Sequence, residues 1–305
     1  MNILLTGSSG QVGHALKFAL IGTGGVIIPL RDQMDLSKPD LLRATIRKVK
    51  PDIIINPAAY TAVDQAESDT DLAYAINSIA PGILAEEAKR LNAALIHFST
   101  DYVFDGSKSD SRGDITPYTE QDIPCPINVY GKTKLAGEEA IRSIRCKHLI
   151  FRTSWVYSGF GKNFLLTILR LAKERDHLKI VNDQWGAPTC ATWIAHTTTE
   201  ILKQLKKSDN SENWWGENSG LYNMTSSGIT NWSEFAKKII QLGLNCELLS
   251  PPISQIEGIP SSEYLTKASR PKNSLLSNKS LEEKFRIQSN SWQEQILNCL
   301  NTEFA

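Results

Sequence analysis

The sequence predicts an α/β protein built on a doubly wound parallel sheet, with a smaller, loop-rich α/β lobe packed against it. The first half of the chain alternates short apolar stretches with longer segments of helical periodicity. Those short stretches are continuously apolar, which is typical of parallel strands buried on both faces. The second half is less regular and is interrupted by polar and proline-rich segments, as expected for a smaller lobe.

The first half supplies the strands and helices of the expected sheet. Strands are predicted at 2–7, 25–30, 51–59, 93–99 and 148–157, and helices at 11–22, 40–50, 70–92 and over the stretch NVYGKTKLAGEEAI (128–141). We expect Pro81 to disturb the long helix, because a proline removes a backbone hydrogen bond from a helix interior.

The second half combines helices with long loops. Helices are predicted at 163–176, 191–207 and 231–243, a strand running into a loop at 178–189, and loop-rich segments at 208–220 and 251–277. Asn231 followed by Glu234 three residues later is a helix-start pattern. The polar segment 208–220 is expected to be an exposed loop.

The composition indicates a soluble cytoplasmic protein. The chain has 305 residues, enough for about two lobes, and 33 basic residues balance 33 acidic ones. The balanced net charge does not indicate binding to nucleic acid or to an acidic membrane surface. No segment approaches the roughly 20 apolar residues of a membrane helix. The five cysteines are scattered without a CxxC pair, which favours reduced thiols over disulfides or a zinc cluster.

A glycine-rich loop opens the chain between the first strand and the first helix. TGSSGQVG places Gly7, Gly10 and Gly13 where a tight turn and a helix N-terminus can receive a pyrophosphate. This predicts a Rossmann-type dinucleotide-binding domain. We assign it residues 1–157 plus about 191–225, and assign about 158–190 plus 226–305 to the smaller lobe.

The end of the second strand bears on which dinucleotide binds. In LRDQMDLS, Arg31 could meet a 2′-phosphate, whereas Asp32 or Asp35 could accept a hydrogen bond from a ribose hydroxyl. The same residues also fit a reading as ordinary solvated charges. Arg31 favours NADPH, and NADH stays open.

Tyr130 and Lys134 share one face of the helix predicted over 128–141. A phenol has a pKa near 10, and a nearby ammonium stabilises the phenolate, so such a tyrosine can protonate a carbonyl oxygen during hydride transfer. The spacing alone also fits two surface side chains. Ser99 and Thr100 end the fourth strand at the edge where open α/β sheets bind ligands, and a Thr100 hydroxyl there could orient the same carbonyl.

These motifs resemble the extended short-chain dehydrogenase/reductase superfamily, and within it the family of dTDP-4-dehydrorhamnose reductases. The resemblance runs over nearly the whole chain, through LLTGSSGQVG, NPAAYTAVDQAES, STDYVFDG, NVYGKTKLAGE, FRTSWVY, NDQWGAPT and ASRPKNSLL. It implies reduction of dTDP-4-dehydro-L-rhamnose to dTDP-L-rhamnose with NADPH or NADH, the last step of dTDP-L-rhamnose biosynthesis.

The resemblance also implies roles for individual residues. Tyr130 would be the proton donor, Lys134 would hold the nicotinamide ribose and lower the tyrosine pKa, and Thr100 would complete the triad. The cofactor would contact Gln11, Val12, Gly13, Asp35, Leu36, Ala59, Tyr60 and Thr61. The sugar nucleotide would contact Thr100, Asp101, Tyr102, Phe104, Trp155, Asn182, Gln184 and Arg270. The alternative to substrate binding for Trp155 is a purely structural role in the hydrophobic core.

The chain departs from the family at its metal site. Some members are dimers joined by Mg²⁺ held by glutamates, and the corresponding positions here are Ala15 and Thr192 (or Ala191). We therefore expect no metal-bridged dimer, a monomer, and chemistry that needs no metal. The segment 105–126 is expected to close over the substrate.

Two other functions fit parts of the sequence. One is another nucleotide-sugar enzyme of the same superfamily, an epimerase or dehydratase; Asp101 followed by Tyr102 lacks the Asp-Glu pair of a dehydratase. The other is a non-catalytic, NADP-binding regulatory subunit resembling the methionine adenosyltransferase beta subunit. The Thr100, Tyr130 and Lys134 set favours the enzyme.

Overall fold

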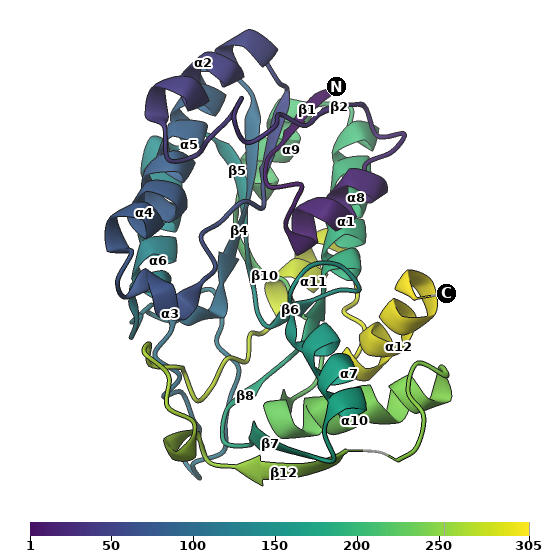
Figure 1. Cartoon of the computed structure of the whole chain (residues 1–305). Helices are drawn as coiled ribbons and strands as arrows, with labels where there is room; N and C mark the ends of the chain where they lie inside the picture. The colour runs from purple at the N-terminus through teal and green to yellow at the C-terminus, as the bar shows by residue number, and fades with distance from the viewer. Residues whose placement is uncertain (253, 305) are drawn as a thin grey trace.

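The central feature of the computed structural model, which describes residues 1–252 and 254–304, is a six-stranded parallel sheet (Figure 1). In spatial order its strands are β10 (Gly220–Asn223), β5 (Lys147–Thr153), β4 (Ala94–Thr100), β3 (Ile53–Asn56), β1 (Asn2–Leu5) and β2 (Gly25–Ile27). Every neighbouring pair in this sheet is parallel.

Helices cover both faces of the sheet. Because side chains alternate along a strand, Ile3 and Leu5 are buried in the core on one face and Leu4 in the core on the other. The first core includes side chains of α1 (Gln11–Ala19), α8 (Ala191–Lys207), α9 (Ser211–Asn218) and α11 (Lys279–Phe285). The second includes side chains of α2 (Pro39–Val49), α5 (Ala80–Leu91) and α6 (Val129–Ile144). The predicted doubly wound Rossmann-type fold is confirmed.

The strand order reverses between β1 and β3. From β1 the chain continues to β2 on one side, and the strands from β3 onward follow on the other side. In an open α/β sheet such a switch point leaves a crevice at the carboxyl ends of the strands, where ligands bind. The glycine-rich loop after β1 and the residues after β3 flank this crevice.

The predicted long helix at 70–92 is disturbed close to Pro81, as expected. It consists of α4 (Thr70–Tyr74), a π-helical turn η1 (Ala75–Ile79) and α5, which has its proline in the first turn. The wider π turn precedes the proline, whose missing N–H is tolerated in a first helical turn.

The second lobe packs around its own core. Its helices are α7 (Phe164–Glu174), α10 (Trp232–Asn245) and α12 (Trp292–Glu303), beside the parallel pair β7 (His177–Val181) and β12 (Gln255–Ile259). Short pairs join β6 (Val156–Tyr157) to β9 (Thr189–Cys190) and β8 (Trp185–Gly186) to β11 (Thr230–Asn231). The remaining short elements are α3 (Val63–Ala66), η2 (Asp101–Val103) and η3 (Ser261–Glu263). Asn231 caps α10 by accepting from the Glu234 N–H at 2.9 Å, as predicted.

The prediction of an exposed loop at 208–220 is wrong. Residues 211–218 form α9, whose Asn210 side chain accepts from the N–H groups of Glu212 and Asn213 at 2.9 and 3.1 Å. Trp215 is only 5% exposed and belongs to the core beside the sheet. Trp214 packs against the same core, so two adjacent tryptophans within a polar segment hold this short helix on the protein.

The predicted division of the chain into two domains stays a prediction. The sixth strand, β10, comes from the segment 191–225 that we assigned to the nucleotide-binding domain. Leu281 and Phe285 of α11, which follow residue 226, are buried in the same core. Within the described residues, no helix is both long and apolar enough to cross a membrane.

Because Gly216 lies in a helix and Gly113 lies in a turn with positive φ, we expect alanine to change the free energy of unfolding in opposite directions at these two positions. An added Cβ would meet nothing within 4 Å at Gly216 in α9 or at Gly113, but Gly113 has a φ of +86°. Gly216→Ala should raise the free energy of unfolding by about 0.5–1 kcal/mol, because glycine is a poor helix residue. Gly113→Ala should lower it, because alanine is strained at positive φ. Denaturant titration of both variants tests this, and no stabilisation by Gly216→Ala would contradict a helix there.

Candidate active site

The glycine-rich loop has the close backbone packing that only glycine permits. Gly7 has a φ of +57°, and a Cβ on it would lie 2.7 Å from Ala58 Cα after β3. A Cβ on Gly13 would lie 2.0 Å from the Gly7 carbonyl oxygen. The loop therefore folds back on the first turn of α1, as a pyrophosphate-binding loop must.

The start of α1 is free to receive an anion. Its N-cap is Gly10, whose backbone is extended and which has no side chain to cap the first N–H groups. The side chain of Gln11 is engaged elsewhere: its Nε2 donates to the Val156 carbonyl at 3.2 Å, and its Oε1 accepts from Asn163 at 2.9 Å. Val12 packs against the core. Gln11 and Val12 can therefore contact a cofactor through their backbone atoms.

Asn77, which the sequence reasoning missed, holds the loop after β3. Its Oδ1 accepts from the Tyr60 N–H at 2.8 Å, and its Nδ2 donates to the Tyr60 carbonyl at 3.0 Å and to Thr133 Oγ1 of α6 at 3.1 Å. The segment containing Ala59, Tyr60 and Thr61 is thus fixed relative to α6. A buried asparagine inside an apolar helical pattern was the signal available in the sequence.

Charged residues after β2 lie near the surface. Arg31 is exposed, and Asp35 Oδ1 accepts from the Ser37 N–H at 2.9 Å and hydroxyl at 2.7 Å. The Ser37 hydrogen bonds hold the Asp35 pKa below its usual value. Leu36 packs against the core under α2. The Arg31 side chain is exposed and forms no hydrogen bond or ion pair with the residues that the structure describes, whereas the Asp35 carboxylate accepts hydrogen bonds from Ser37.

The start of α6 is pressed against the end of β4. Asn128 caps the helix, accepting from the Gly131 N–H at 2.8 Å, and its Nδ2 donates to the Ser269 carbonyl at 2.8 Å. A Cβ on Gly131 would lie 2.1 Å from the Tyr102 carbonyl oxygen. This close approach sets the Tyr130 ring 5.6 Å from that of Tyr102, edge to face.

Tyr130 and Thr100 meet at this point. Burial raises the pKa of Tyr130 to about 12, and a hydrogen bond with the Thr100 side chain opposes the rise. The Thr100 hydroxyl also donates to Asp101 Oδ1 at 3.1 Å and accepts from the Tyr102 N–H at 3.2 Å. The phenol is therefore neutral at neutral pH and holds a proton that it can give.

Lys134 is buried one helical turn beyond Tyr130. Its Nζ donates to the Phe98 carbonyl at 2.6 Å and lies 3.3 Å from His97 Nε2. Burial lowers the pKa of Lys134 to about 8, against the raising effect of Glu138. The expected lowering of the Tyr130 pKa by Lys134 stays a prediction, because burial is the larger effect on Tyr130 in this structure and the Lys134 ammonium donates to β4.

Two of the expected substrate contacts are buried instead. Phe104 is 0% exposed; it stacks on Tyr118 with ring centroids 4.1 Å apart and lies 5.0 Å from the Arg152 guanidinium. Asp101 is also buried, and this burial raises its pKa to about 6. Neither side chain offers a surface to a substrate here; Asp101 instead orients Thr100.

An aromatic pair marks the second-lobe side of the site. Trp155, with a φ of +48°, stacks on Trp232 at 3.7 Å between ring centroids, and Trp232 Nε1 donates to Gln184 Oε1 at 3.2 Å. A Cβ on Gly186 would lie 2.6 Å from the Trp155 ring. The structure therefore brings Trp155 and Gln184 together through Trp232, which the sequence reasoning missed although it directly follows the N-cap of α10.

Arg270 and Asn182 occupy different surroundings. Arg270 pairs with Asp64 of α3 at 2.8 Å, so that the second-lobe segment is tied to the loop after β3. Its charge also lowers the pKa of Tyr102, although burial raises that pKa overall. Asn182 is exposed, and its N–H donates to the Ile259 carbonyl at 2.9 Å.

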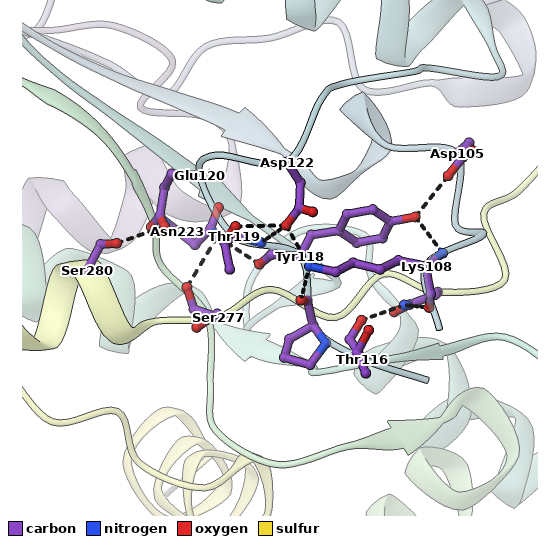
Figure 2. Close-up of polar contacts among 12 residues, drawn as sticks. Asp105, Lys108, Thr116, Tyr118, Thr119, Glu120, Asp122, Asn223, Ser277 and Ser280 are labelled. Atoms are coloured by element: carbon purple, nitrogen blue, oxygen red, sulfur yellow. Dashed lines mark hydrogen bonds and ion pairs between the residues drawn. The ribbon is translucent and has the colours of Figure 1, made fainter. Parts of the chain in front are cut away.

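The segment expected to close over the substrate is anchored at its second half (Figure 2). Lys108 Nζ pairs with Asp122 at 2.6 Å, and the Tyr118 hydroxyl donates to Asp105 at 2.8 Å. Glu120 accepts from the Asn223 N–H of β10 at 2.8 Å and from the Ser280 hydroxyl at 2.9 Å. Movement of the whole segment 105–126 would break the two Glu120 bonds, which reach outside it, so any closure is confined to its exposed tip.

Ala15 and Thr192, the positions at which the resemblance expects glutamate ligands of Mg²⁺, line one cavity. Ala15 and Thr192 border a space of about 440 Å³ together with Glu303 of α12, and the Thr192 hydroxyl donates to Glu303 Oε1 at 2.5 Å. Cys190 and Cys299 also lie near this carboxylate. That the chemistry needs no metal stays a prediction.

Known proteins resemble this chain over nearly its whole length. A family model described as RmlD substrate binding domain matches residues 1–304. The dTDP-4-dehydrorhamnose reductases of Burkholderia thailandensis and Escherichia coli K12 are 44% and 41% identical, covering 98% and 100% of this chain and 98% and 99% of those proteins. A crystal structure of dTDP-4-dehydrorhamnose reductase from Bacillus anthracis in complex with NADP is 31% identical, with a TM-score of 0.87 over 98% of each chain.

The glycine packing predicts a graded response to alanine. Gly13→Ala should cost about 1–3 kcal/mol or more, because its Cβ would collide with the Gly7 backbone, and should weaken nicotinamide cofactor binding. Gly10→Ala is the control: its Cβ would lie 3.4 Å from the Gly7 oxygen, and losing a glycine N-cap costs less than about 1 kcal/mol. Unfolding and calorimetric binding titrations compare the two, and equal stability would refute the close packing.

Proposed function

The chain belongs to the RmlD substrate binding domain family, and on that premise we propose that it reduces dTDP-4-dehydro-L-rhamnose to dTDP-L-rhamnose with NAD(P)H. The reaction would be the last step of dTDP-L-rhamnose biosynthesis. The observation that carries the proposal is the close packing of the start of α6, with Tyr130, against the residues that follow Thr100 at the carboxyl edge of the sheet, in a chain that resembles these reductases from end to end.

The glycine-rich loop and its neighbours fit a dinucleotide. The loop packs so closely at Gly7 and Gly13 that a Cβ would collide with the protein's own backbone, and this tight turn and the uncapped start of α1 suit a pyrophosphate. Ala59, Tyr60 and Thr61 would border the middle of the cofactor. When bound, the cofactor supplies a hydride to the C4 carbonyl carbon. The free Arg31 side chain supports NADPH over NADH.

Tyr130 is the proposed proton donor to the C4 oxygen. Its raised pKa keeps the proton on the phenol until negative charge develops on the carbonyl oxygen. The Thr100 hydroxyl would hydrogen-bond to the same oxygen and orient it, once its one hydrogen turns from Asp101 Oδ1 to the substrate. Lys134, one turn along α6, would stabilise the Tyr130 phenolate that remains. Each unit by which the Tyr130 pKa falls corresponds to about 1.4 kcal/mol of this stabilisation.

The second lobe would position the nucleotide sugar. The Trp155 ring, held by Trp232, offers an apolar face to the C–H groups of a deoxysugar. Tyr102 lies beside Tyr130, and Arg270 has the fork geometry that suits a diphosphate, provided that Asp64 releases it. Asn182 and Gln184 are further candidates for contacts to the substrate.

We also propose that the protein works as a cytoplasmic monomer without a nucleic-acid or membrane partner. The balanced charge of 33 basic and 33 acidic residues supports this, as does the loss of the glutamate ligands at Ala15 and Thr192. Analytical ultracentrifugation with and without Mg²⁺ would test it, and a magnesium-dependent dimer would overturn it.

A direct assay tests the proposed reaction. Purified protein mixed with dTDP-4-dehydrorhamnose should oxidise NADPH, and more slowly NADH, as followed by absorbance of the reduced nicotinamide. The reason for the order is the free Arg31 guanidinium, which can meet the 2′-phosphate. No oxidation with either cofactor would sink the reductase proposal.

The proton-donor role predicts a selective defect. Tyr130→Phe should bind cofactor nearly as tightly as the wild type and lose about 10²–10⁴-fold in kcat, because it removes only the transferable proton. Tyr222→Phe is a matched control, since the Tyr222 hydroxyl donates to the Asn218 carbonyl within the core, away from the site. Near-normal turnover by Tyr130→Phe would mean that the proton comes from another group.

A further inference from the structure

A chain of buried polar side chains joins the glycine-rich loop to Lys134. Thr6, directly before Gly7, lies with its hydroxyl 2.6 Å from Asn56 Oδ1, and Asn56 Nδ2 lies 3.0 Å from His97 Nδ1. On the other side of the ring, His97 Nε2 lies 3.3 Å from Lys134 Nζ. The four residues come from the end of β1, from β3, from β4 and from α6.

Because these four side chains are buried, each of their donors must face an acceptor within the protein. Thr6, Asn56, His97 and Lys134 are 5%, 0%, 1% and 1% exposed, so water does not satisfy a mismatched donor or acceptor. Lys134 already donates to the Phe98 carbonyl and has further protons to place.

Only one neutral form of His97 suits a charged Lys134. A proton on Nε2 would face the ammonium donor to donor, so Nε2 must be bare and the ring proton must lie on Nδ1. That proton needs an acceptor at Asn56. A 180° rotation of the Asn56 amide provides it and keeps the Thr6 contact, because a hydroxyl accepts as readily as it donates.

We propose that His97 is a positioning residue for the reduction: neutral and protonated on Nδ1, it accepts a hydrogen bond from the Lys134 ammonium and fixes that charge relative to the glycine-rich loop. The inference rests on the proposed function, because it gives His97 a task through the role of Lys134 there. It goes beyond that function because it assigns a positioning role to His97, which acts through Lys134 and not on the substrate directly.

The charges around the pair agree with this arrangement. Burial, and then the Lys134 charge, keep the pKa of His97 well below its usual value. Glu138 faces Lys134 from the next turn of α6 and is itself held by Arg152 of β5 at 2.9 and 2.6 Å. Because the charged lysine is the working form, kcat should fall as pH rises through its pKa of about 8. Without the His97 acceptor that fall should begin at lower pH.

Nitrogen NMR of the cofactor-free protein tests the proton arrangement independently of turnover. The ¹⁵N shifts of His97 should show a neutral ring at neutral pH with hydrogen on Nδ1 and a bare Nε2. A proton on Nε2, or an imidazolium, would overturn the proposal. Because this measurement needs no substrate, it stands even if the protein fails to reduce dTDP-4-dehydrorhamnose.

Two variants test the consequence for catalysis. His97→Met removes the acceptor at similar volume and should move the alkaline fall of kcat down by about one pH unit, with about a fivefold loss in kcat at the wild-type midpoint. His97→Gln places an amide oxygen near the former Nε2 and should restore most of the profile. A wild-type profile in His97→Met would overturn the proposal, as would a failure of His97→Gln to recover any of a shifted profile. If His97→Met does not fold, the NMR result decides.

Discussion

The site depends on how closely α6 docks against the carboxyl edge of the sheet. Gly131 sets that distance, because its Cβ would lie 2.1 Å from the Tyr102 carbonyl oxygen just after β4. Gly137 lets the same helix approach η1, where a Cβ would lie 2.1 Å from the Asn77 carbonyl oxygen. With hydrogen atoms in their place, the helix approaches backbone to backbone. Tyr130 thereby reaches Thr100 at one end of the contact, and Lys134 reaches the end of β4 one turn along.

The docking also sets the electrostatics of the proposed reaction. Burial raises the pKa of Tyr130 to about 12 and lowers that of Lys134 to about 8, so both groups are protonated at neutral pH. A neutral phenol beside a buried cation is poised to give a proton and then to be stabilised as phenolate. The same burial is what obliges His97 to serve Lys134 as a hydrogen-bond acceptor.

Much of this could be predicted from the sequence because the deciding signals are local. The alternation of apolar strands and helices defines the sheet, and the strand ends carry Thr100 and the glycine-rich loop. The α9 helix was missed because its apolar anchors, Trp214 and Trp215, are flanked on both sides by polar residues. The stack of Trp155 on Trp232 and the pairing of Arg270 with Asp64 join residues far apart in the chain, and no local pattern encodes such contacts.

The turnover of Gly131→Ala tests the central claim most directly. Its Cβ would push the start of α6 away from Tyr102, and a displacement of about 1 Å at a reacting group can cost about 100-fold in rate. The account predicts a folded variant, by circular dichroism, that has lost about 100-fold in kcat for reduction of dTDP-4-dehydrorhamnose. A folded variant with kcat within about twofold of the wild type would contradict it.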